Sequence, residues 1–179
     1  MDHGLGQRHF PADLIARCSP TVVLEVGVGA GFDATRFCST GVRYIGIDRS
    51  AAAVTVTAAR LTQSEMTCSV HSADFFKFSP PETPDLIFDR GVFHNQRSDA
   101  ERDSFAARCA QLLGDHGHWI SVIGSADCVT KTPHGEMRLT TVIATVERYF
   151  EIEALEKRPY GPADWPDNFD AWHCLFRKR

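Results

Sequence analysis

The sequence lacks an excess of basic residues. Its 179 residues include 19 Lys and Arg against 23 Asp and Glu, which gives a formal net charge of -4. Proteins that hold nucleic acid or an anionic membrane surface by electrostatic attraction usually present a basic patch or stripe. We therefore expect neither nucleic acid nor membrane among the partners of this chain.

Long apolar stretches and closely spaced cysteines are missing too. The longest apolar runs have the length of a β-strand, too short to cross a bilayer, and residues 1–10 have no basic segment followed by an apolar one, as a signal peptide would. The six Cys form no C-x-x-C pair and no zinc-binding spacing. We expect no metal site, cysteines that act as small core residues, and a cytoplasmic location.

What is present is a regular alternation of strand and helix patterns. With 43% hydrophobic residues the chain can form one domain over residues 1–179. Strands are expected over 21–29, 42–48, 68–74, 85–89 and 118–124, with helices over 11–18, 32–39, 50–62, 99–113 and from 140. This alternation predicts an α/β sandwich around a mostly parallel sheet. No helical pattern separates 150–157 from 171–178, so these two strands are expected to pair as an antiparallel hairpin.

A glycine-rich segment follows the first expected strand. It reads Glu25-Val26-Gly27-Val28-Gly29-Ala30-Gly31, and such glycines let the backbone turn tightly and approach a ligand. The dinucleotide fingerprint G-x-G-x-x-G would need glycine at position 32, where Phe32 stands. A carboxylate at position 25 suits the ammonium group of an amino-acid tail better than it suits a pyrophosphate.

Acidic residues end four successive strands. They are Glu25, Asp48, Asp74 and Asp89, and in a parallel sheet these positions share the edge where ligands bind. Asp48 can accept hydrogen bonds from two ribose hydroxyls, and Asp74 with its aromatic neighbour suits an adenine.

The stretch DLIFDRGVFHN, residues 85–95, can be interpreted in two ways. Asp89 and His94 could form a catalytic acid–base pair, or Asp89 could belong to a cofactor-binding edge with the histidine beside it. The three other strand-end acids favour the second interpretation. It leaves His94 as the candidate catalytic residue.

The motifs VVLEVGVGAGFDATRF, YIGID, SADFF, DLIFDRGVFHN and LLGDHGHWISVIG, in this order, resemble class I S-adenosylmethionine-dependent methyltransferases. The likeness covers residues 20–178 and is greatest to small-molecule enzymes of the thiopurine- and tellurite-methyltransferase type. It implies a Rossmann-like three-layer sandwich whose seven-stranded sheet contains one antiparallel strand. It also implies S-adenosylmethionine as cofactor, held by Glu25, Gly27, Gly29, Gly31, Asp48, Arg49, Asp74, Phe75, Asp89 and Arg90.

The activity implied is in-line methyl transfer to an S, N or O atom of a small molecule. A thiolate needs no base, whereas a hydroxyl or ammonium acceptor must lose a proton, which His94 is placed to take. The candidate acceptor-binding residues are His9, Phe10, Phe93, Asp127, His134 and Trp165, with residues 1–19 as an N-terminal helix and lid and 125–138 as a substrate loop.

Two other functions stay open at this stage. One is methyl transfer to RNA or protein, and the other is cofactor binding without methyl transfer by a descendant of the same fold. The sequence also leaves open the acceptor atom and whether the chain is a monomer or a homodimer.

Overall fold

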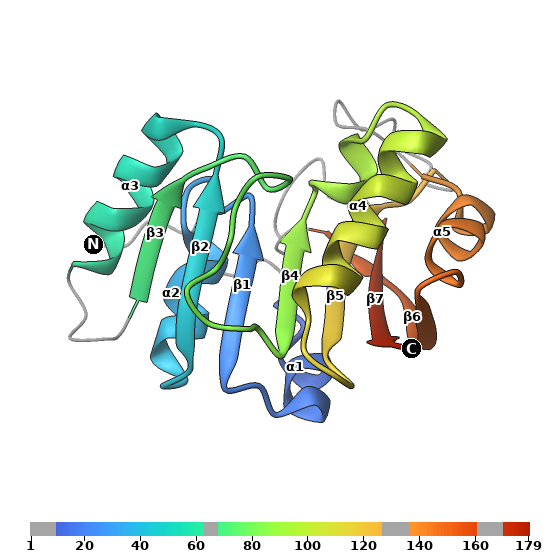
Figure 1. Cartoon of the computed structure of the whole chain (residues 1–179), viewed down its shortest axis with the longest axis horizontal. Helices are drawn as coiled ribbons and strands as arrows, with labels where there is room; N and C mark the ends of the chain where they lie inside the picture. The colour runs from blue at the N-terminus through green and yellow to red at the C-terminus, as the bar shows by residue number, and fades with distance from the viewer. Residues whose placement is uncertain (1–9, 63–67, 127–136, 161–169) are drawn as a thin grey trace.

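Figure 1 shows the computed structural model of the chain, which describes residues 10–62, 68–126, 137–160 and 170–179. Within these residues a seven-stranded sheet has the order β3-β2-β1-β4-β5-β7-β6. Its strands are β1 Val22–Val26, β2 Arg43–Asp48, β3 Cys68–Ser72, β4 Leu86–Arg90, β5 His118–Gly124, β6 Phe150–Pro159 and β7 Asp170–Lys178. The helices are α1 Ala12–Cys18, α2 Phe32–Ser39, α3 Ala51–Leu61, α4 Asp99–Leu112 and α5 Leu139–Val146, with a short 3₁₀ helix, η1, at Phe93–Asn95.

The strands pair as the sequence predicts. The pairs from β3 to β5 are parallel, and β7 lies antiparallel between β5 and β6. The chain steps outward from β1 to β3 and then returns to place β4 on the other side of β1. Such a reversal of strand order opens a crevice at the carboxyl ends of the two central strands.

Helices cover both faces of the sheet, which gives the predicted three layers. The first three helices pack on one face and α4 and α5 on the other (Figure 1). Successive side chains of β1 point to opposite faces of the sheet and so contribute to both cores. Val23 packs with α1 and α2, while Leu24 packs with α4 and α5. Of the described helices of the chain, none is long and apolar enough to cross a membrane.

Local signals fix where the helices begin. The hydroxyl of Ser50 accepts a hydrogen bond from the amide of Ala53 and caps α3, as expected. Ser98 caps α4 in the same way through the amide of Glu101. The 3₁₀ helix after β4 was not predicted, because three residues carry no periodic signal.

The cysteines correct one expectation. Cys38 and Cys68 form a disulfide across 30 residues of sequence, whereas we expected all six to be core residues without a partner. The end of α2 and the start of β3 lie side by side, with 6.3 Å between the two Cα atoms. Cys109 and Cys174 do serve as buried core residues.

Candidate functional site

A cavity of about 310 Å³ opens at the carboxyl ends of the first three strands. This volume is in the range of small-molecule binding sites. Five of the predicted cofactor residues line it, namely Gly27, Asp48, Arg49, Asp74 and Phe75. The sequence missed its other lining residues, which are Val26, Ile47, Ala73, Phe76, Val92, Gln96 and Phe105.

The glycine loop needs its glycines for two physical reasons. Gly27 has a φ of +81°, in the left-handed region, and a Cβ on it would lie 2.4 Å from Cγ2 of Val92. Gly31 has a φ of +76°, and its Cβ would lie 2.9 Å from the Thr57 side chain. A side chain at position 27 would therefore fill space beside the cavity and strain the backbone as well.

Asp48 holds this loop and still has acceptor capacity. One carboxylate oxygen accepts a hydrogen bond from the amide of Gly29 at 3.0 Å, and the other accepts from the amide of Ser50 at 2.9 Å. A carboxylate oxygen can accept two hydrogen bonds. The geometry therefore allows each oxygen of Asp48 to take one more donor from a ligand in the cavity.

Asp74 and the two phenylalanines after it form the next part of the wall. The Asp74 carboxylate accepts a hydrogen bond from the Phe76 amide at 3.0 Å, which folds the segment into a tight turn. Phe75 is buried against Phe105, with 4.7 Å between ring centroids, whereas Phe76 is 46% exposed. A polar group thus lies next to a flat apolar surface, as an adenine requires.

Thr57 supports the glycine loop from α3. Its side chain is fully buried, and its hydroxyl donates a hydrogen bond to the carbonyl of Gly29 at 3.1 Å. Because Gly29 also donates to Asp48, the loop is tied to two elements at once. No motif singles out a threonine inside a helix, so sequence reasoning missed it.

Glu25 is held by a partner on the neighbouring strand. Its side chain is buried, and one carboxylate oxygen accepts a hydrogen bond from the Tyr44 hydroxyl at 2.5 Å. The Tyr44 side chain lies over Gly46, where an added Cβ would be 2.7 Å from the hydroxyl oxygen. Burial, together with the Glu25 charge, keeps the pKa of Tyr44 well above its usual range, so Tyr44 remains a donor.

Comparison with known proteins decides the family. Residues 23–117, more than half of the chain, match the family model described as a methyltransferase domain. The chain belongs to this family. Its predicted likeness to class I S-adenosylmethionine-dependent methyltransferases is thereby confirmed.

Individual relatives agree with this assignment. An uncharacterised methyltransferase of Geobacillus kaustophilus is 35% identical over 97 residues, which are 54% of this chain and 43% of that protein. The chain therefore matches less than half the length of this relative.

Two solved structures share the methyltransferase fold. An S-adenosylmethionine-dependent methyltransferase from Methanosarcina mazei has a TM-score of 0.81 at 11% identity, over 96% of this chain and 99% of that chain. The 1,6-didemethyltoxoflavin N1-methyltransferase of Burkholderia thailandensis, solved with its substrate and S-adenosylhomocysteine, has a TM-score of 0.73 at 19% identity, over 93% and 75% of the two chains. At these identities the likeness concerns the fold alone.

Asp89 supports the end of β4 from inside the core. Its fully buried carboxylate accepts hydrogen bonds from the amides of Val92 and Phe93 and from the Trp119 indole. These bonds position η1, while burial raises the pKa of Asp89. Asp89 is not among the described residues that line the cavity. It affects the cavity by positioning the backbone of Val92, which does line it.

Arg90 forms a buried ion pair with Asp33 at the start of α2. The guanidinium donates to both carboxylate oxygens, at 2.7 and 3.2 Å, and less than a tenth of either side chain is exposed. The pair ties the helix that follows the glycine loop to the end of β4. Its partner Asp33 was not predicted, because the two residues are 57 positions apart.

His94 lies in η1 and is 5% exposed. Its Nδ1 accepts a hydrogen bond from the amide of Gly124, at the end of β5, at 2.9 Å. Since a backbone amide can only donate, Nδ1 carries no hydrogen, and the neutral ring bears its hydrogen on Nε2. The catalytic role of His94 stays a prediction, but in this geometry Nε2 offers a donor instead of a base.

The predicted acceptor-binding residues are only partly described. Phe93 is fully buried against Phe105 and Trp119, and its role in acceptor binding stays a prediction. Phe10 packs edge-on against Phe37 beside α2, with 5.1 Å between ring centroids. His9, Asp127, His134 and Trp165 lie outside the described residues.

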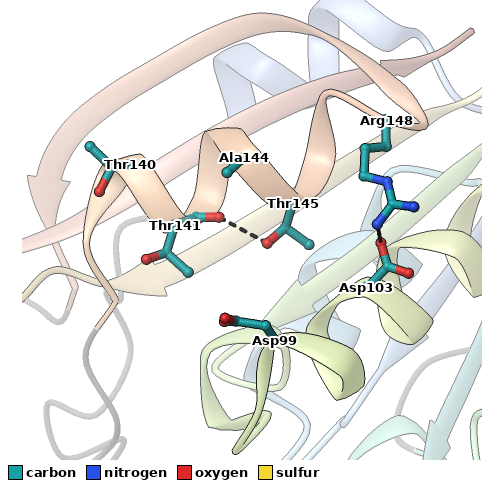
Figure 2. Close-up of a pocket in the computed structure, with 7 residues that line it drawn as sticks. All are labelled: Asp99, Asp103, Thr140, Thr141, Ala144, Thr145 and Arg148. Atoms are coloured by element: carbon teal, nitrogen blue, oxygen red, sulfur yellow. Dashed lines mark hydrogen bonds and ion pairs between the residues drawn. The ribbon is translucent and has the colours of Figure 1, made fainter.

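A second cavity, of about 330 Å³, lies between α4 and α5 (Figure 2). Its polar groups bind each other, since Arg148 donates to Asp103 at 2.6 Å and the Thr145 hydroxyl donates to the carbonyl of Thr141 at 2.8 Å. It includes none of the predicted cofactor residues. Within the described part of the chain, no group of three or more His, Cys, Asp or Glu is arranged to hold a metal ion.

Proposed function

We propose that the chain transfers a methyl group from S-adenosylmethionine to a small molecule. The observation that carries this proposal is the cavity that Asp48, Asp74 and Phe75 line together with Gly27 of the glycine loop. Bound S-adenosylmethionine supplies a methyl group on a positively charged sulfur, which is already activated for displacement. The protein then has to bind, align and exclude water.

The residues present fit the parts of this cofactor. The two acceptor positions left on the Asp48 carboxylate suit the ribose hydroxyls, and Asp74 beside the Phe75 ring suits the adenine. The close approach of Gly27 to Val92 leaves no room for a side chain at position 27, so a ligand there would meet bare backbone. Glu25, held by Tyr44, supplies the carboxylate at the strand end that an ammonium group requires.

A small-molecule acceptor is supported by charge and by the neighbours of the fold. The net charge of -4 offers no basic footprint for nucleic acid. Among the structural neighbours, the Burkholderia thailandensis enzyme was solved with the small molecule 1,6-didemethyltoxoflavin bound. The N-methyltransferase NodS of Bradyrhizobium japonicum was crystallised with S-adenosylhomocysteine.

Titration calorimetry with S-adenosylhomocysteine tests the proposal. We expect the protein to bind it, and Asp48→Asn to weaken the affinity roughly 10- to 100-fold, because hydrogen bonds to charged groups are lost. Asp99→Asn, the same change at an exposed position of α4, serves as the matched control and should bind as the wild type does. Folded protein that binds neither S-adenosylhomocysteine nor S-adenosylmethionine would refute the proposed function.

A further inference from the structure

Two hydrogen-bonding side chains converge beside Gly91, directly after β4. A Cβ on Gly91 would lie 3.0 Å from the Tyr160 hydroxyl oxygen and 3.7 Å from Nε2 of His94. The next residue, Val92, lines the cofactor cavity. The two polar groups therefore lie beside a residue that is the chain neighbour of one that lines the cavity.

The backbone at this point is fixed on both sides. The amide of Gly91 donates to the carbonyl of Val122 at 3.1 Å, and its carbonyl accepts a hydrogen bond from the Asn95 side chain. A φ of +83° makes glycine the favoured residue here. The backbone at Gly91 is thus held in place, with the Tyr160 hydroxyl and the His94 ring next to it.

Contacts within the chain hold both residues in place. The Gly124 amide donates to Nδ1 of His94 and so leaves the hydrogen on Nε2, which is on the ring edge that faces Gly91. Tyr160 follows β6, and the Arg90 guanidinium lies 5.6 Å from its ring centroid while donating to its carbonyl at 3.4 Å. His94 and Tyr160 each have a further interaction within the chain, with which a bound acceptor would have to compete.

We propose that the Tyr160 hydroxyl and Nε2–H of His94 bind the methyl acceptor as a pair of donors, and that the acceptor is an oxygen or sulfur anion such as a phenolate or thiolate. This rests on the proposed function. A neutral amine has one lone pair, which it needs for attack, so it cannot accept from Nε2–H at the same time. An ammonium group would direct its own hydrogens at that donor. A thiolate or phenolate has three lone pairs, enough to accept two hydrogen bonds and still attack.

The reaction balances without a base. A lone pair of the anion forms the new bond to the methyl carbon while the bond from that carbon to the positive sulfur breaks. The products are a neutral methylated acceptor and S-adenosylhomocysteine, and no proton moves. Because the acceptor loses its charge as the bond forms, donors to the anion stabilise the bound substrate more than the transition state. Their loss should therefore raise KM and leave kcat unchanged or higher.

The probe for the test is 4-nitrothiophenol, whose thiolate absorbs visible light. We would titrate it into wild-type protein saturated with S-adenosylhomocysteine and follow the absorbance shift, then measure its methylation with S-adenosylmethionine. In both assays Tyr160→Phe should weaken the interaction, with Kd and KM raised roughly 10- to 100-fold. Tyr149→Phe removes a hydroxyl that instead binds Asp103 beside α4, and it should behave as wild type.

Two replacements of His94 distinguish the role of Nδ1 from that of Nε2. His94→Asn keeps an acceptor where Nδ1 stands and removes the donor, whereas His94→Gln keeps a donor near Nε2. We expect His94→Asn to raise Kd for the thiolate and His94→Gln to retain more affinity. Imidazole ¹⁵N shifts of the free protein should show Nδ1 without hydrogen, a readout independent of activity.

The outcomes separate the two proposals. If folded wild-type protein binds neither S-adenosylhomocysteine nor S-adenosylmethionine, the proposed function fails. If it does bind, three results would each overturn the acceptor proposal: failure to bind the thiolate, equal thiolate affinity in Tyr160→Phe and wild type, or faster methylation of benzylamine than of the thiolate. Hydrogen on Nδ1 of His94 would also overturn it.

Discussion

Removal of the positive charge at Arg90 should greatly reduce the stability of the fold. Arg90→Met keeps most of the length and apolar surface of the side chain but leaves the Asp33 carboxylate buried without its cation. Only 5% of the Asp33 side chain and 3% of the Arg90 side chain is exposed. A charge left alone at such burial typically costs about 3–5 kcal/mol.

The exposed pair between Arg43 and Glu82 supplies the comparison. Its N–O distance of 2.9 Å is close to that of the buried pair, but its side chains are 53% and 48% exposed. Water screens such pairs, so Arg43→Met should cost about 0–1 kcal/mol. In a domain of this size, 3–5 kcal/mol corresponds to a fall in Tm of about 6–20 °C.

Urea unfolding followed by circular dichroism measures both variants, with the slope of the transition checked for a change in the unfolded state. The double variant Arg90→Met with Asp33→Leu tests the cause. If the unpaired carboxylate is responsible, removing it should recover most of the loss. A cost at Arg90 no larger than that at Arg43, or no recovery in the double variant, would show that the buried pair does not contribute in this way.

Three further predictions concern the loop, the cavity and the N-terminal helix. Thr57→Val should weaken S-adenosylhomocysteine binding several-fold, because the hydrogen bond that supports the glycine loop is lost. Calorimetry should find near wild-type affinity in Thr57→Ser, which keeps the hydroxyl. Gly27→Ala should lose at least about tenfold in the same assay, because of backbone strain and the contact with Val92. The hydrogen bond from Arg158 lowers the pKa of Asp13 from 3.8 to about 2, so the stability it contributes is present above about pH 4 and is lost as the pH falls through 2. In urea unfolding at a series of pH values, Asp13→Asn should differ from wild type at pH 7 and converge with it near pH 2; a constant difference would contradict this.

The arrangement of the elements could be predicted because it follows from local patterns. Apolar strands followed by glycines or acids, Ser50 before an apolar helix, and the absence of a helical pattern between residues 157 and 171 each indicate structure within a few residues of themselves. The sheet, its reversed strand and four of the residues that line the cavity, Gly27, Asp48, Asp74 and Phe75, follow from these signals, whereas Arg49 was implied by the family resemblance.

The partners of the site residues could not be predicted, because they depend on which strands become neighbours. Glu25 meets Tyr44 only because β1 and β2 pair in the register that sets Glu25 beside Gly46. The Cys38–Cys68 disulfide similarly depends on the end of α2 reaching the edge strand β3. His94 was recognised from the sequence, but the hydrogen-bonding direction of its ring is set by Gly124, 30 residues away.

The position of β7 between β5 and β6 has a consequence for biosynthesis. β6 is made first but touches the sheet only through β7, so it cannot dock when it leaves the ribosome. At about 5–20 residues per second, the 46 positions from the end of β5 to the start of β7 take a few seconds. During this interval β5 is an open edge strand that another nascent chain could pair with. The two strands β6 and β7, next to Tyr160, are therefore the last part of the sheet to assemble.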